Sequence, residues 1–171
     1  MTLRVFAFVA TLAISLGASA QPSCGAPTPR DAEGPFYKAG APLRASLAQA
    51  GTKAERLVLT GRVLARDCEP LPNALLDFWQ ADERGEYDNA GFRYRGQLRA
   101  DAEGRYRVET VMPGLYPGRP RHIHVKVQGA AGGRVLTTQI YFGDSAAPAR
   151  LVAKTGRGKG ALQAAFDFVL Q

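Results

Sequence analysis

The chain of 171 residues has few of the side chains that proteins use to hold zinc: it contains two histidines and two cysteines. His122 and His124 are the two histidines, and Cys24 and Cys68 are distant from them in sequence. A tetrahedral zinc site needs a third histidine, a cysteine or a carboxylate beside such a pair. Since no carboxylate stands at helpful spacing on the same segment, the composition disfavours a zinc site.

The sequence also has a single long apolar run, from Val5 to Leu16. This run is shorter than the roughly 20 apolar residues that span a bilayer, which argues against a membrane anchor. It follows Arg4 and ends in Gly17-Ala18-Ser19-Ala20. A short basic start, an apolar centre and small residues at the end are typical of a secretory signal peptide. We expect a signal peptide over residues 1–20, cleavage after Ala20, export to the periplasm or the medium, and no membrane attachment afterwards.

A concentrated basic run is also missing. The formal net charge is +7, from 22 Lys and Arg against 15 Asp and Glu, but the basic residues are spread along the chain. This distribution argues against nucleic-acid binding and is compatible with an anionic ligand. No internal repeat is visible, and about 150 residues after residue 20 suit one domain. We expect an N-terminal arm over residues 21–56 and a single folded domain over residues 57–171.

The two cysteines predict one disulfide bond. An exported protein with a small, even number of cysteines commonly pairs them. Such a bond would tie the N-terminal tail at Cys24 to a turn containing Cys68. Two free, buried thiols are the alternative.

Short apolar segments with a period of two predict an all-β protein. Gly- and Pro-containing turns separate these segments at regular spacing, which favours an antiparallel β-sandwich with short flanking helical turns. The expected strands cover residues 57–66, 74–80, 92–99, 105–112, 122–127 and 135–142. Residues 44–50 and 145–152 are expected to form short helical turns, 156–160 a flexible segment, and 162–170 a last strand or helical turn.

The two histidines lie on one of these expected strands. Residues i and i+2 of a strand point to the same face, so His122 and His124 would project side by side, with Ile123 and Val125 on the opposite, buried face. Two adjacent imidazoles are half of a metal site. Two surface histidines that share a strand face are the alternative, and the rigid segment upstream with Tyr116 and Arg119 argues against it.

Two tyrosines stand in loops beside this strand. Tyr116 precedes His122 by six residues, and Tyr87 ends a loop that follows the second expected strand. Tyrosinate is a hard, anionic oxygen donor that suits ferric iron. Each tyrosine alone is also compatible with a buried ring and a solvated hydroxyl.

Several motifs in order resemble the intradiol ring-cleavage dioxygenases, the family of catechol and protocatechuate 3,4-dioxygenases. The resemblance covers most of residues 33–144 and is carried by Leu59-Thr60-Gly61-Arg62-Val63, Leu71 to Asp82, Gly85-Glu86-Tyr87, Phe92 to Gly96, Pro113 to Pro117, Arg119 to His124 and Leu136 to Asp144. It implies a non-haem Fe(III) enzyme that uses O2 to open a catechol ring between its two hydroxylated carbons, giving a muconate-type diacid. The four protein ligands implied are Tyr87, Tyr116, His122 and His124.

The resemblance also implies roles for residues around the metal. Tyr116 would leave the metal when catechol binds and take a substrate proton. Arg119 would border the substrate ring and stabilise developing negative charge, which is a general electrostatic device. Gln139 would lie near the bound ring and oxygen, and Pro35, Phe36 and Tyr37 would wall the substrate pocket.

Two other functions fit part of the sequence. An exported β-sandwich binding module without catalytic activity shares the expected fold. A zinc hydrolase would combine His122 and His124 with a carboxylate such as Asp88.

Exposed sandwich edges and the habit of the family favour a homo-oligomer. The connection from Tyr116 to His122 is shorter than in better-known members, which implies a more open substrate mouth. The identity of the catechol stays open, and an exported protein would meet plant-derived phenols.

Overall fold

The structure is a computed structural model, and it describes residues 24–129, 133–143 and 146–171. The predicted signal peptide lies outside the described residues. Within the described ranges, no helix has both the length and the apolar character needed to cross a membrane.

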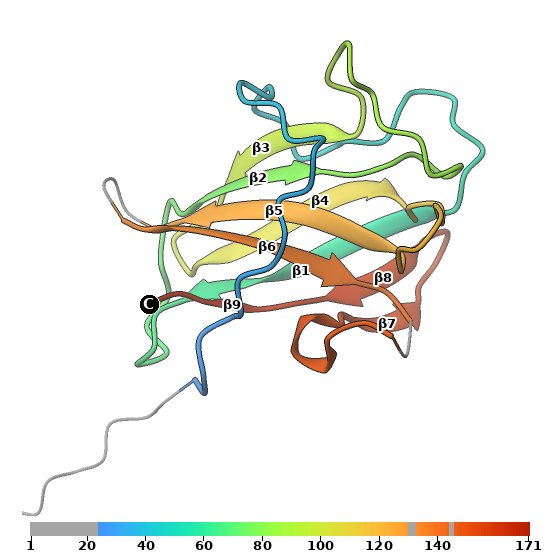
Figure 1. Cartoon of the computed structure of the whole chain (residues 1–171). Helices are drawn as coiled ribbons and strands as arrows, with labels where there is room; N and C mark the ends of the chain where they lie inside the picture. Colours follow the sequence, from blue (N-terminus) through green and yellow to red (C-terminus); the bar gives the residue numbers. More distant parts are fainter. Residues whose placement is uncertain (1–23, 130–132, 144–145) are drawn as a thin grey trace, which may run out of the picture.

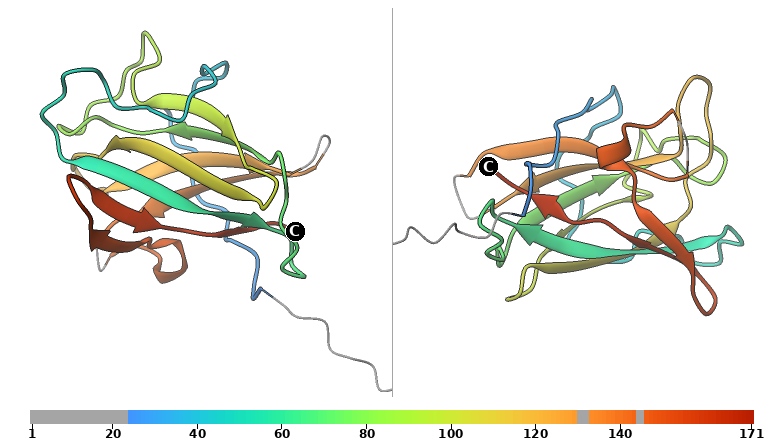
Figure 2. Two further views of the ribbon diagram at one scale, coloured as in Figure 1. Left: turned by 180° about the vertical axis from the view of Figure 1, so that it is seen from behind. Right: turned by 90° about the horizontal axis from the view of Figure 1, so that it is seen from below.

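Two β-sheets lie face to face and form nearly the whole protein (Figures 1 and 2). The first sheet has the order β4-β1-β8-β7 and is built from β1 (Arg56–Leu64), β4 (Arg105–Val111), β7 (Lys154–Arg157) and β8 (Leu162–Ala165), with β9 (Phe168–Val169) paired to β1. The second has the order β3-β2-β5-β6 and is built from β2 (Leu75–Trp79), β3 (Arg95–Arg99), β5 (His122–Gln128) and β6 (Val135–Tyr141). The predicted all-β sandwich is confirmed. Most pairs are antiparallel, as expected, but β1 runs parallel to β8 and β9.

Period-two patterning explains where the core lies. Leu57 and Leu59 of β1 are fully buried, as are Ile123 and Val125 of β5, and these residues belong to one apolar cluster that draws on both sheets. Alternate residues face opposite sides of a strand, so His122 and His124, which alternate with Ile123 and Val125, point to the outer side of the second sheet. That outer side is where the histidines lie.

Residues 44–50 do not form the expected helical turn. The backbone of this segment pairs with both sheets instead: the amide of Arg44 donates to the carbonyl of Gln97 at 2.8 Å, and that of Leu47 to Glu109 at 2.7 Å. Leu47 is 1% exposed. Pairing with two sheet edges and burial of Leu47 override the helix propensity of a short Ala- and Leu-containing segment.

The C-terminal part also differs from expectation. Residues 154–157 form β7, where a flexible segment was expected from residue 156, and their backbone pairs with β8 in antiparallel register. Of the helix expected over 145–152, the structure shows a single 3-10 turn, Ala149–Leu151, and Ser145 lies outside the described residues. Residues 162–170 form the two strands β8 and β9.

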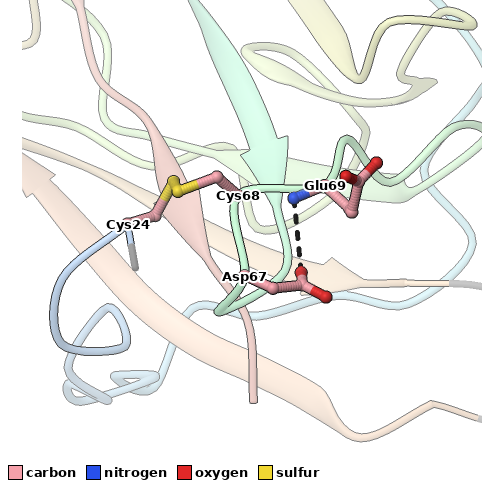
Figure 3. The surroundings of a disulfide bond; sticks show 4 residues. All are labelled: Cys24, Asp67, Cys68 and Glu69. Atoms are coloured by element: carbon pink, nitrogen blue, oxygen red, sulfur yellow. Dashed lines mark hydrogen bonds between the residues drawn. A yellow bond between two sulfur atoms is a disulfide. The ribbon is translucent and has the colours of Figure 1, made fainter. Parts of the chain in front are cut away.

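A disulfide joins Cys24 to Cys68, with 5.0 Å between their Cα atoms, so the predicted pairing is confirmed (Figure 3). From Cys24 the arm runs across the strands of the second sheet, coloured blue in Figure 1. The amide of Asp31 donates to the carbonyl of Thr137 on β6, and Leu43 bridges to Gln97 on β3. The arm therefore covers the outer side of the second sheet from one edge to the other.

Candidate metal centre

The two histidines lie under this arm on the outer side of β5, and each is 2% exposed. His124 pairs with Trp79 of β2 on one side and with Gln139 of β6 on the other. The Trp79 ring lies parallel to the His124 ring, 4.9 Å between centroids with 5° between planes. The ordered strands and this stacking fix the orientation of His124.

The donor atoms of three side chains converge. His122 Nε2 lies 3.1 Å from His124 Nε2 and 3.2 Å from the hydroxyl of Tyr116. Two donors that each stand about 2.1 Å from a metal lie about 3.0 Å apart when their bonds meet at a right angle. The observed separations therefore match neighbouring ligands of one metal ion.

The hydrogen bonding of His122 leaves the nitrogen at this centre free. Its Nδ1 donates to the carbonyl of Pro120 at 2.6 Å, which places the ring proton on Nδ1. Metal-binding histidines commonly donate their other ring N–H to a backbone carbonyl in this way. The lone pair of Nε2 consequently faces His124 and Tyr116.

Burial keeps both histidines neutral. It lowers the pKa of His122, and it lowers the pKa of His124 to about 3, with His122 and Arg119 as further causes. Neutral imidazole is the form that binds metal ions. Burial, followed by the neighbouring Tyr116, raises the pKa of Tyr87, so this phenol stays protonated unless a cation is bound nearby.

Two glycines bring the tyrosine loops together. A Cβ on Gly85 would lie 2.4 Å from the carbonyl oxygen of Leu115, and one on Gly114 would lie 2.3 Å from the amide nitrogen of Gly85. The amide of Gly114 donates to the carbonyl of Asp82 at 2.8 Å. Because neither position carries a side chain, the loop that holds Tyr87 packs directly on the loop that contains Gly114, Leu115 and Tyr116.

Tyr87 is packed between the arm and the other metal-site side chains. Its ring stacks on Phe36 with 4.3 Å between centroids, and it meets Tyr116 edge-on at 6.0 Å and His124 at 6.2 Å. The Tyr87 hydroxyl is buried and has no hydrogen-bond partner among the described residues. An unpartnered buried phenol beside the converging donors fits a fourth ligand.

Arg119 and Gln139 form a connected pair at this centre. The guanidinium of Arg119 donates to Gln139 Oε1 at 2.6 Å, and Gln139 Nε2 donates to the carbonyl of Ala32 in the arm at 2.8 Å. Gln139 is 0% exposed. The amide therefore orients Arg119 and is itself oriented by the arm.

The three predicted pocket-wall residues divide into two groups. Phe36 contacts the metal-site residue Tyr87, as described above, whereas the Tyr37 hydroxyl donates to Asp77 at 3.2 Å and its ring lies 4.9 Å from that of Trp79. Pro35 lines an open cavity of about 380 Å³ together with Phe36 and Tyr37. All three residues thus border this cavity, while Phe36 also contacts Tyr87 and Tyr37 contacts Trp79.

Sequence reasoning left out several residues that the structure places here. The Trp79 ring stacks on His124, and Asp77 accepts the hydrogen bond of the Tyr37 hydroxyl. The Tyr141 hydroxyl donates to Asp31 at 2.8 Å, and its ring lies 5.7 Å from that of His122. The register of β2, β5 and β6 would have identified Trp79 and Tyr141, but strand register is not visible in one sequence.

The donor set favours a metal that accepts phenolate. Among the described residues, no group of three or more His, Cys, Asp and Glu side chains is arranged to hold a metal ion. The carboxylate of Asp88 accepts hydrogen bonds from the amides of Ala90, Gly91 and Arg93 instead of reaching the histidines. Two imidazoles with two phenols suit ferric iron, so the residues present fit the predicted group.

A β-sandwich with two imidazoles and two phenols gathered under an N-terminal arm defines a candidate metalloprotein, and similarity to known proteins identifies its family. The family model described as Dioxygenase matches residues 32–119. Catechol 1,2-dioxygenase 2 of Acinetobacter lwoffii is 38% identical over 139 residues, covering 66% of this chain and 50% of that protein. The protocatechuate 3,4-dioxygenase beta chain of Burkholderia cepacia is 40% identical over 105 residues, covering 52% of this chain and 45% of that protein. The chain thus spans about half the length of the curated relatives it matches.

Solved structures of dioxygenases are also similar to this protein. The dioxygenase domain of a dioxygenase and carbohydrate-binding protein fusion from the cellulolytic bacterium Streptomyces sp. SirexAA-E superposes with a TM-score of 0.81 and 43% identity, covering 85% of this chain and 99% of that one. Catechol 1,2-dioxygenase from Pseudomonas arvilla C-1 superposes with a TM-score of 0.74 and 30% identity, covering 85% of this chain and 62% of that one. The chain belongs to the intradiol ring-cleavage dioxygenase family.

Proposed function

We propose that the protein is a non-haem Fe(III) dioxygenase that cleaves a catechol-type ring between its two hydroxylated carbons, using O2 and giving a muconate-type diacid. The observation that carries this proposal is the convergence of Tyr116, His122 and His124 at 3.1–3.2 Å, with the buried Tyr87 phenol beside them. When bound, ferric iron would supply a Lewis acid that draws electron density from a catecholate and prepares the ring for O2.

The surroundings of the two tyrosines support different roles. The ring of Tyr87 stacks on Phe36 and its hydroxyl is buried, so Tyr87 would stay in place throughout the reaction. Tyr116 is partly exposed and follows Leu115, which is 56% exposed, so it borders the surface. We assign to Tyr116 the role of making way for the substrate and accepting one of its hydroxyl protons at the phenol oxygen. Exchange of an anionic phenolate for an anionic catecholate keeps the charge of the centre nearly constant.

Arg119 is the fixed cation of this site. Its hydrogen bond to Gln139 holds the guanidinium beside the donor cluster, where it would stabilise negative charge that develops on the substrate ring. Phe36 and Pro35 would bound the substrate ring on the side of the arm, and His122 and His124 are each 2% exposed.

Oxygen consumption and metal content test this proposal together. The purified protein should contain about one iron per chain and absorb visible light through tyrosinate-to-iron charge transfer, and it should take up O2 with catechol or protocatechuate. A colourless protein with stoichiometric zinc would refute it. If the protein bound no metal and took up no O2, a β-sandwich binding module without catalytic activity would be favoured instead. Family membership and the cluster of donor atoms argue against that alternative.

We also propose that the protein is exported. The predicted signal peptide motivates this, and the disulfide supports it because such bonds persist mainly in oxidising compartments. N-terminal sequencing of the secreted protein should begin at Gln21. The similar Streptomyces domain is part of a fusion with a carbohydrate-binding protein, which supports a catechol of plant origin as substrate. Self-association stays a prediction, which light scattering of the purified protein would check.

A further inference from the structure

One buried cation near the metal centre has no role in the mechanism above. Arg95, the first residue of β3, is 1% exposed and ranks among the largest fully buried side chains. Among the described residues it forms no ion pair with a carboxylate. Burial lowers its pKa, and the nearby Asp88, Tyr87 and Asp77 oppose this shift. A buried guanidinium without an ion pair requires other partners.

Backbone carbonyls are the partners of this guanidinium. Nη1 donates to the carbonyl of Phe36 at 2.7 Å, while Nε and Nη2 donate to the carbonyl of Asp88 at 3.2 and 3.0 Å. The planar fork of an arginine is suited to holding two acceptors in a fixed relation. Arg95 thereby joins the arm to the loop that follows β2.

The two residues whose carbonyls Arg95 binds, Phe36 and Asp88, are both neighbours of Tyr87. Phe36 is the residue whose ring stacks on Tyr87, and Asp88 follows Tyr87 directly in the chain. The buried hydroxyl of Tyr87 lies near Tyr116, and no partner among the described residues forms a well-aligned hydrogen bond with it. Its position depends on its backbone and on the stacked ring, and Arg95 holds each of them.

The same arginine ends a row of side chains that crosses the sheet. Arg95 pairs with Trp79, Trp79 with His124, and His124 with Gln139, all on the outer face. Trp79 and His124 are stacked within this row, and its members are no more than 2% exposed. The row relates the position of the Tyr87 loop to that of the histidine strand.

We propose that Arg95 is a positioning residue of the metal centre, which holds the main chain at Asp88 and the arm at Phe36 so that the phenol of Tyr87 is directed at the histidine nitrogens. This inference rests on the proposed function for the identity of the metal. The contacts that define it involve protein atoms alone and can be tested without metal.

The variants Arg95→Gln and Arg95→Lys test the role, and Arg99→Gln is the matched control. Arg99 lies on the same strand, is exposed, and donates to the carbonyl of Asn73. Loss of a side chain that orients metal ligands commonly costs 10- to 100-fold in metal affinity or activity. We expect Arg95→Gln to weaken iron retention by about 10- to 100-fold, to shift or weaken the visible band, and to lower kcat more than it changes KM for catechol. Arg95→Lys should lie between wild type and Arg95→Gln, because one ammonium keeps the charge without the fork.

Amide hydrogen exchange of the metal-free proteins gives a second measurement. Peptides covering residues 34–38 and 87–92 should exchange faster in Arg95→Gln than in Arg99→Gln, while β5 should be unchanged. Should Arg95→Gln fail to fold, Arg95→Lys supplies the same comparison. Exchange, iron retention and visible band equal to those of the control would overturn the proposal. If wild type binds no iron, the proposed function fails, whereas the exchange data still decide whether Arg95 positions the loop and the arm.

Discussion

Removal of the disulfide should destabilise the protein by an amount that its loop length sets. Cys24 and Cys68 are separated by 44 residues. In the chain-entropy model, cross-linking a loop of this length removes conformational entropy from the unfolded state and raises its free energy by about 4 kcal/mol at 25 °C. A domain of about 150 residues changes its Tm by about 2–4 °C per kcal/mol, so the double variant Cys24→Ser/Cys68→Ser should melt about 8–16 °C below wild type.

Differential scanning calorimetry of the double variant and the wild type measures this difference. Wild type incubated with a reducing agent is the matched control, and its Tm should fall to that of the double variant. A decrease of less than about 3 °C in both samples would refute the reasoning, since the arm would then be held by its backbone and side-chain contacts alone. If the Tm fell in the double variant and stayed unchanged in reduced wild type, the two serine side chains would be the cause of the decrease.

Three further predictions concern the centre and its loops. In the iron-loaded protein, Tyr116→Phe should change the visible band and lower kcat by about 100-fold or more, since a proton acceptor is lost; the control Tyr94→Phe should do neither, and an unchanged band in both would contradict the ligand assignment. Gln139→Leu should lower the free energy of unfolding by about 1–3 kcal/mol in urea titrations, because Arg119 and an arm carbonyl lose their partner; equal stability would argue that water replaces the amide. Backbone amides hold the pKa of Asp88 at about 2, below its unfolded value, so its stabilisation is complete above about pH 5 and is lost as the pH falls toward 2; the stability gap between wild type and Asp88→Asn should therefore narrow between about pH 5 and pH 2.5, and a constant gap would contradict this.

Period-two patterning predicted the strands that form the core, because one apolar face per strand is a local property of the chain. The same pattern placed His122 and His124 side by side, as their 3.1 Å separation shows. It failed for residues 44–50, since the partners of that segment, Gln97 and Glu109, are distant in sequence. It failed for β7 because three glycines between residues 156 and 160 suggested flexibility, whereas pairing with β8 orders the segment.

The environment of the site could not be predicted in the same way. An arginine in a strand normally faces solvent, and Arg95 is buried beside an arm residue, Phe36, that lies 59 residues earlier in the chain. The stacking of Trp79 on His124 follows from strand register, which a single sequence does not determine. The motifs could therefore nominate ligands, and their mutual distances required the fold.

The contact between Gly85 and Gly114 restricts how the substrate mouth can be re-engineered. A side chain at either position would drive the two tyrosine loops apart, since each added Cβ would collide with backbone atoms of the other loop. A Cβ at Gly118 would meet no atom within 4 Å, but its φ of +75° disfavours a side chain there. A change of length beside Gly118 would displace Arg119 and Pro120, which contact Gln139 and His122. Libraries that seek bulkier ring substrates should therefore keep both glycines and the length of this span unchanged.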